Sequence, residues 1–556
     1  MALASNKMAF DVELEMNSMD ANGLRNRSDL RQISEQQVKD SDTLALARAG
    51  KKQVLARRFG FISVVGFACT LMNTWEGVVT TFLLGYQKYL NGGPAGLIYG
   101  FLIAWVGTLC VFISLGELNS MTPTAGGQYH YVHILAPPGS RKLLSYITGW
   151  MTVLGWVSAT ATASFFASSL IQGLVILCNP SYEAERWHGT FIYWAVILLT
   201  LSVNTIFSKV LPAFEVTVLI LHVLGFFAVL IPLVKLAPHT NSSEIWGTFL
   251  NSGWNTMGLA FFIGLQGVAA PLVGTDGAIH MSEEIKGAAR TVPRAMVYSI
   301  VINGFLGGGM LLATIYCAGD LEKAADSPTG YPFIAIFATG VRSVAGATVM
   351  VSITVIMAWS NAIGCLASAS RMMWSFARDN GLPFAPQLSK VQTRSALPMS
   401  AITVVTVGAM LLGLINIGST SVFNDVISLA LEGLFSSYLI ALVLLLYRRI
   451  QGDIIEETDS PDIPQGEALQ SEKQLRWGPW RVKGIFGTVV NFIGCVYLLI
   501  MIFFCFWPAT LPVTAINMNY SSLIWGTVVI GSLLYYAIKA RKIYTGPIVE
   551  IGVFAA

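Results

Sequence analysis

Two of the long apolar segments are each interrupted near the middle by residues that disfavour a membrane helix. The first interruption covers residues 71–78 and contains Asn73, Glu76 and Gly77, and the second covers residues 264–276 and combines glycines, a proline and an aspartate. In hydrocarbon an unwound backbone and an ionisable side chain are both costly, so they occur where protein or a water-filled cavity surrounds them. Paired interrupted helices are typical of secondary transporters, whose binding site lies between the breaks. We therefore expect a buried site where the two segments face each other.

The scarcity of charge along the chain indicates a membrane environment. Of 556 residues, 54% are hydrophobic and 12% are charged, whereas soluble domains carry about 25% charged residues. We therefore expect an all-α, multi-pass membrane protein in contact with lipid. The net charge of +3 gives no basis for a nucleic-acid partner.

Twelve segments are apolar over the length needed to cross a bilayer, about 20 residues. We predict that all twelve are transmembrane helices, the ninth and twelfth being the shortest. Their ranges are Ile62–Leu84, Leu97–Leu115, Tyr146–Leu174, Phe191–Phe207, Leu211–Val234, Met257–Met281, Ala295–Cys317, Ala345–Met373, Ala401–Ile415, Val422–Tyr447, Ile485–Trp507 and Leu523–Ile538.

Lys and Arg residues cluster beside every second predicted helix end. The richest clusters lie at residues 48–58, 286–294, 371–394, 448–483 and 539–542. Because basic residues favour cytoplasmic loops, we expect both termini in the cytoplasm. Two sequons, at Asn241 and Asn519, fall in predicted outer loops and are candidate glycosylation sites.

The predicted helices divide the chain into five regions. Residues 1–58 are polar and mixed in charge, which predicts a disordered cytoplasmic tail. Residues 59–447 hold a ten-helix transport core, and residues 448–484, rich in Asp, Glu, Pro and Gln, form a cytoplasmic linker. Residues 485–540 hold helices 11 and 12, and residues 541–556 form a second cytoplasmic tail.

Three stretches carry a family signature. The first covers residues 117–131, which join the second and third predicted helices, and it is followed by residues 145–150. The second covers residues 274–284 and is followed by basic residues up to Arg294. The third covers residues 371–383. In this order they resemble the amino acid–polyamine–organocation (APC) superfamily. The closest resemblance is to its fungal branch of amino acid, GABA and choline permeases.

The resemblance implies an architecture and an activity. Helices one to five and six to ten would be related as a five-plus-five inverted repeat, with helices 1 and 6 discontinuous and two extra helices at the C-terminus. The chain would be a secondary active transporter in the plasma membrane. It would move an amino acid or amine-type solute, GABA-like or choline-like, by alternating access and with proton coupling.

Other functions are compatible with such a fold or must be compared with it. A metabolite exporter of the same fold and a non-transporting nutrient sensor are the open alternatives. An enzyme is not expected, because the sequence contains no zinc-like cysteine spacing, Gly-rich phosphate loop or Ser-His-Asp set with family-like spacing. Neither a metal nor a cofactor is predicted.

The residues at the two breaks are the candidate substrate contacts. Free N–H groups of a half-helix that faces a cavity make an anion site. The alternative is that these residues only cap helix ends and relax packing. The candidates are Asn73, Thr74, Trp75, Glu76, Gly77, Gln266, Ala270, Leu272, Gly274 and Thr275.

Glu76 is the most specific of these candidates. A carboxylate at the start of the second half-helix would occupy the positive end of its dipole, and the adjacent Trp75 offers an aromatic face to a cation. These two residues favour an amine-bearing or quaternary-ammonium substrate over an acidic one. The open alternative is that Glu76 bonds backbone N–H groups and never meets substrate.

Carboxylates inside predicted helices are candidates for proton coupling: Glu76, Asp276, Glu215 and Glu432. A buried carboxylate can take up a proton on the more acidic outer side and release it inside. Glu215 and His222 are seven residues apart and therefore share one helix face. Asp276 could instead serve as the N-cap of the helical segment that follows the second break.

Overall fold

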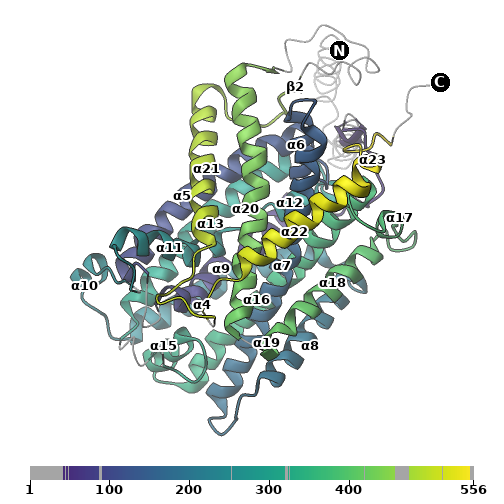
Figure 1. Ribbon diagram of the computed structural model, residues 1–556. Helices are drawn as coiled ribbons and strands as arrows, with labels where there is room; N and C mark the ends of the chain where they lie inside the picture. The colour runs from purple at the N-terminus through teal and green to yellow at the C-terminus, as the bar shows by residue number, and fades with distance from the viewer. Residues whose placement is uncertain are drawn as a thin grey trace, which may run out of the picture.

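The computed structural model describes residues 42–550, except 44, 48, 87–90, 252, 320–323, 325, 419, 457–474 and 516. This part of the chain is predominantly helical (Figure 1) and includes one parallel pair of two-residue strands, β1 (Ile454–Ile455) and β2 (Leu475–Arg476). Most of the predicted N-terminal tail, the middle of the predicted linker and residues 551–556 lie outside the described residues.

Helices make up most of the described chain. In chain order they are α3 (Phe61–Met72), α4 (Thr74–Tyr86), α5 (Gly93–Met121), α6 (Gln128–Leu135), α7 (Arg141–Cys178), α8 (Arg186–Thr205), α9 (Leu211–Leu236), α10 (Ser242–Gly247), α11 (Met257–Ala269), η1 (Ala270–Leu272), α12 (Gly277–His280), η2 (Ser282–Glu284), α13 (Ala288–Tyr316), α15 (Pro332–Val341), α16 (Val344–Arg378), α17 (Ala385–Leu388), α18 (Met399–Gly413), α19 (Ile415–Gly418), α20 (Thr420–Gln451), α21 (Gly484–Cys505), α22 (Ser521–Tyr535), η4 (Tyr536–Ala540) and α23 (Arg541–Ile543).

Ten helical segments of the described chain are long and apolar enough to cross a membrane, and they coincide with ten of the twelve predicted spans. The remaining two are α8, which has Arg186 and His188 at one end and Asn204 at the other, and α11, which is shortened by the second break. The chain is therefore a multi-pass, all-α membrane protein. The count of twelve spans and the inverted repeat stay predictions.

Small residues allow the central helices to pack closely. α7 packs along α16 and α20 more extensively than any other pair of elements in the described chain. Gly155 of α7 meets Gly433 of α20 so closely that a Cβ on Gly433 would lie 2.7 Å from the backbone nitrogen of Gly155. Helices in membranes associate through such close backbone contacts, because lipid provides no hydrophobic driving force between them.

The last two long helices pack on the outside of this centre. α21 lies against α5 and α20, and α22 crosses α7 and α20 obliquely (Figure 1). α22 exposes large apolar side chains such as Leu523, Ile530 and Leu534. In a membrane such a surface faces lipid.

The segments before α3 and after α23 lie together at one end of the bundle, which we call the terminal end (Figure 1). Lys51 is only 1% exposed and forms an ion pair with Asp379 at the end of α16. The backbone N–H of Glu550 donates to the Gly50 carbonyl (2.8 Å), and that of Ile548 donates to Asp379 (2.9 Å). The two terminal segments therefore share one buried carboxylate.

The residues after the second break are tied to the same place. Arg378 of α16 donates to both carboxylate oxygens of Glu283, at 2.7 and 3.1 Å, and its Nε lies 3.3 Å from Glu550. Arg371 donates through Nε to Glu284 (2.8 Å). Bidentate arginine–carboxylate pairs of this kind fix geometry as well as energy. The terminal end is thus closed by charge pairs that join four segments of the chain.

The glycine contact predicts a measurable loss of stability. Gly433→Ala places a methyl group against backbone that cannot move aside, and overpacking of this kind costs about 1–3 kcal/mol. We expect a lower melting temperature in detergent. The matched control is Gly531→Ala on α22, where a Cβ meets no atom within 4 Å. Equal melting temperatures for the two variants would contradict the packing described for α7 and α20.

The buried ion pair predicts a non-additive pair of mutations. Lys51→Met leaves the Asp379 carboxylate buried without its cation, and breaking a buried pair in this way costs about 3–5 kcal/mol. The double variant Lys51→Met/Asp379→Asn removes both charges and should recover part of that loss. Thermal unfolding of the three variants measures the coupling. Purely additive effects would show that the two side chains do not interact.

Candidate functional site

The first break is a single residue wide. α3 ends at Met72, Asn73 adopts the left-handed conformation (φ 48°, ψ 46°), and α4 begins at Thr74. The backbone groups that the break frees find side-chain partners: Asn361 of α16 donates to the Leu71 carbonyl (2.9 Å), and the Thr74 N–H donates to the Asn303 side chain (3.3 Å). The sequence prediction of an interrupted helix here is confirmed.

The second break is longer. α11 ends at Ala269, the 3-10 turn η1 follows, Val273 is extended, and Gly274 has a φ of 119° that favours glycine. The chain becomes helical again only at α12. A second interrupted segment was also predicted, and its open stretch covers residues 273–276.

The two breaks touch each other. The Thr74 hydroxyl of α4 donates to the carbonyl of Pro271 in η1 (2.7 Å). A Cβ on Gly77 would lie 2.7 Å from the Cβ of Pro271, and one on Gly274 would lie 3.0 Å from the Leu71 carbonyl oxygen. The side-chain-free surfaces of two glycines therefore let the backbones of the two breaks meet.

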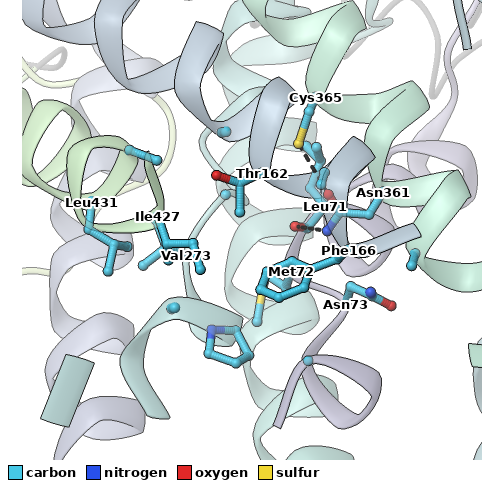
Figure 2. Close-up of a pocket in the computed structure, with 18 of the residues that line it drawn as sticks. Leu71, Met72, Asn73, Thr162, Phe166, Val273, Asn361, Cys365, Ile427 and Leu431 are labelled. Carbon is cyan, nitrogen blue, oxygen red and sulfur yellow. Dashed lines mark hydrogen bonds between the residues drawn. The ribbon is translucent and has the colours of Figure 1, made fainter. Parts of the chain in front are cut away.

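A cavity of about 120 Å³ lies beside this contact (Figure 2). The breaks form one wall, and α7, α16 and α20 form the others. The larger and the polar side chains of these walls are Trp156, Thr162 and Phe166 of α7, Asn361 and Cys365 of α16, and Ile427 and Leu431 of α20. Among the described residues that line the cavity, none is Asp, Glu, Lys, Arg or His.

Three polar groups on these walls have no hydrogen-bond partner among the described residues. They are the Asn73 side-chain oxygen, the Thr162 hydroxyl and the Trp156 indole N–H. A buried polar group without a partner costs about 1–3 kcal/mol, so a bound molecule that satisfies these groups would gain affinity from each. Each of the three groups belongs to a residue that lines the cavity.

Four of the predicted substrate contacts line the cavity: Asn73, Gly77, Ala270 and Gly274. Others point elsewhere. The Thr275 hydroxyl contacts that of Ser299 in α13 (3.0 Å), and Gln266 donates to the hydroxyl of Ser428. Leu272 is fully buried and, like Thr74, does not line the cavity.

Trp75 and Glu76 turn away from the cavity towards α9. The Trp75 indole N–H donates to the backbone carbonyl of His222 (3.0 Å), and a carboxylate oxygen of Glu76 lies 2.9 Å from Nδ1 of His222. All three side chains are fully buried. Sequence reasoning placed His222 on the face of α9 that carries Glu215 but did not pair it with Glu76.

The other predicted proton-coupling carboxylates are separate from one another. Asp276 accepts a hydrogen bond from Gln128 of α6 (2.9 Å) and lies 3.8 Å from His280. Glu432 of α20 accepts from Ser521 of α22. Glu215 is fully buried on α9 and interacts with Thr70 of α3. None of these three side chains lines the cavity.

Most of the residues on α7, α16 and α20 that line the cavity were missed from sequence. These helices are long and apolar on several faces. A helix of that composition has no polar stripe to show which face meets a cavity. A threonine and an asparagine inside apolar helices were the available signal, but many such residues bond only to their own helix, as Thr160 does.

The two predicted glycosylation sites differ in exposure. Asn241 is exposed just before α10. Asn519 is 5% exposed, and its side-chain nitrogen donates to the carbonyls of Cys505 (2.7 Å) and Trp507 (3.3 Å). Attachment of a glycan requires that nitrogen to be free, so the geometry favours Asn241 over Asn519.

Burial lowers the pKa of two histidines in α6, His130 and His133. Burial, together with the nearby Arg141 charge, lowers the pKa of His133 to about 4. Burial also holds the pKa of His130 well below its usual range. Among the described residues, no group of three His, Cys, Asp or Glu is placed to hold a metal ion.

Comparison with known proteins identifies the family. The family model described as amino acid permease matches residues 59–530, and the chain belongs to this family. The match confirms the resemblance read from the three signature stretches. Members of this family are transporters and not enzymes, and the chain is accordingly a transporter by family.

Individual relatives support the same assignment. A Macrophomina phaseolina protein provisionally named amino acid/polyamine transporter is 31% identical over 83% of this chain and 97% of its own length. The choline transporter of Saccharomyces cerevisiae is 27% identical over 94% of this chain and 88% of its own. An amino-acid permease of Arabidopsis thaliana is 26% identical over 92% and 98%, respectively.

The unpartnered hydroxyl predicts a specific loss of affinity. Thr162→Val keeps the shape of the side chain but removes one hydrogen bond to a bound solute, worth about 0.5–1.5 kcal/mol. We expect KM for uptake to rise by about 2- to 12-fold, with the amount of folded protein unchanged. The control is Thr217→Val, an exposed threonine of α9 that bonds to its own helix. If both variants kept the KM of the parent, Thr162 would not contact the solute.

Proposed function

We propose that this chain is a secondary active transporter that carries a small amino acid or amine-type solute across a membrane by alternating access. The observation that carries the proposal is the cavity between two broken helices, with unpartnered polar groups on its walls. Broken helices at mid-membrane depth are the usual place for a carried solute.

The cavity favours a solute with a single ammonium group. Its lining has no carboxylate to pair with a cation directly. However, Asp276 lies two residues from the lining residue Gly274 and is bonded to the uncharged Gln128, so it favours positive over negative charge in the cavity. Trp156 and Phe166 offer aromatic faces to an ammonium or methylammonium group.

Several solutes meet these conditions and others do not. A neutral amino acid, GABA or choline carries one ammonium group, and a carboxylate on the first two can accept from the unpartnered Trp156 N–H or Thr162 hydroxyl. A polyamine would bury several positive charges without a carboxylate, which is costly. An acidic amino acid would bring a net negative charge towards the buried Asp276 carboxylate. We therefore rank single ammonium compounds above both.

The proposed orientation, driving force and location rest on sequence features. The distribution of Lys and Arg supports cytoplasmic termini, and the proposed location is the plasma membrane. Buried carboxylates at the break and on α9 and α20 support proton coupling. The five regions proposed from sequence, with a ten-helix core at 59–447 and helices 11 and 12 at 485–540, are retained in this scheme.

Two alternatives share the fold. A metabolite exporter would use the same cavity with the opposite gradient, and a nutrient sensor would bind solute without moving it. Accumulation of radiolabelled solute in vesicles distinguishes a carrier from a sensor, because a sensor binds but does not accumulate.

A ligand screen tests the substrate class. Purified full-length protein is heated with neutral amino acids, GABA, choline, glutamate or spermidine, and a ligand present at 100 times its Kd stabilises by about 2.7 kcal/mol. We expect a melting shift with one or more single-ammonium compounds and none with glutamate or spermidine. A shift with spermidine or glutamate alone would overturn the proposed class.

A further inference from the structure

We infer that Glu76 and His222 form one proton-binding pair that positions α4 from behind the cavity wall, without contacting the solute. This inference rests on the proposed proton-coupled transport and names the groups that carry the proton. His222 would act as a positioning residue. Glu76 is thereby moved from the set of substrate contacts to the coupling machinery.

The two side chains share a buried hydrogen bond. Glu76 Oε1 and His222 Nδ1 are 2.9 Å apart, and both side chains are fully buried. The outer atoms, Oε2 of Glu76 and Nε2 of His222, have no hydrogen-bond partner among the described residues. The two facing atoms are therefore hydrogen-bonded to each other, whereas the outer polar atom of each side chain has no partner.

The net charge of the pair depends on how many protons it holds, so the pair can act as a switch. With one proton between them the two groups are neutral overall, either as carboxylate and imidazolium or as carboxylic acid and imidazole. A second proton, taken from water, forms an N–H or O–H bond at an outer atom and gives the pair a net charge of one. A buried net charge without a partner is strongly unfavourable, so the second proton favours a conformation in which water reaches the pair. Loss of that proton to water on the other side restores the neutral pair.

The first turn of α4 connects this pair to both breaks. Thr74 bonds to Pro271 of the second break, Trp75 to the His222 carbonyl, and Glu76 to the His222 ring. Gly77, the next residue, lines the cavity. A shift of α9 relative to α4 would therefore move the cavity wall and the contact between the breaks together.

Few other charges act on the pair. Cys69 of α3 interacts electrostatically with Glu76, and Glu215 lies about two turns before His222 on α9. α13 and α16, which pack on α9, carry their Arg residues at their terminal-end portions, and α15 has no ionisable residue. Glu76 and His222 are thus the two ionisable side chains that meet directly between α4 and α9 in the described chain.

The test separates solute movement from proton coupling. Parent and variant chains are reconstituted in vesicles, and both radiolabelled choline and radiolabelled GABA are followed in two modes. The first is uptake driven by an imposed pH gradient, and the second is counterflow without a gradient. Coupling between sites is typically worth 5–150-fold.

We expect Glu76→Gln and His222→Gln each to reduce the gradient-driven stimulation at least about fivefold while counterflow persists. The double variant should be no worse than either single variant, because the two residues act as a unit. His239→Gln, at an exposed histidine just after α9, is the control and should keep the stimulation. Glu76→Asp should restore a gradient response with a shifted pH profile.

Each other outcome has a defined meaning. A parent chain that moves solute without any response to the gradient overturns the proton coupling itself, and the pair with it. A parent that responds, with Gln variants that respond equally, overturns only the pair. Loss of counterflow together with gradient-driven uptake would show that Glu76 contacts the solute.

If the variants do not fold, a measurement on the parent chain still tests the pair. Infrared difference spectra of protein with isotope-labelled histidine report the protonation of the imidazole rings. A histidine band that changes with pH, and changes again when choline or GABA binds, supports the pair. Histidine bands that are indifferent to the solute overturn it.

Discussion

The fold depends on satisfying the backbone of two broken helices inside a membrane. The first break frees few groups because it is one residue wide, and Asn361 and Asn303 bond the groups nearest to it. The Thr74 hydroxyl then holds the second break through the Pro271 carbonyl. Since these bonds are made by the protein itself, the groups left over on the cavity wall are side chains and not the strained backbone. Recognition of a solute is therefore assigned to a few side chains on otherwise apolar walls.

The charges of the molecule are divided between two places. At the terminal end, Lys51, Arg371 and Arg378 pair with carboxylates from other segments and close that end of the bundle. Around the cavity, ionisable side chains lie behind the lining residues: Glu76 of α4 is bonded to His222 of α9, and Asp276 is bonded to Gln128. This arrangement gives the cavity an electrostatic preference without a fixed ion pair, which would bind a solute too tightly to release it. The inferred coupling pair fits the same division.

Sequence reasoning predicted the breaks, most spans and the family, because each depends on residues that are local in the chain. Asn73 and Gly274 mark the breaks by composition alone, and both line the cavity. The pairing of Glu76 with His222 was not predictable, since it depends on how α4 and α9 are rotated about their axes. Phe166 and Ile427 were missed for the same reason, because an apolar residue on an apolar helix does not show which way it points. Glycosylation at Asn519 stays a prediction, and the sequon did not reveal that the amide nitrogen of this residue donates to the Cys505 carbonyl.

The shared carboxylate at the terminal end also constrains how the molecule is made. Glu550 and Lys52 are hydrogen-bonded although they lie 498 positions apart, so one partner is synthesised long after the other. Until then the segment at Gly50 lacks its hydrogen bond from Glu550, and Asp379 lacks the one from the Ile548 N–H. The contacts that join the two terminal segments therefore form only after all the long helices between them have been made.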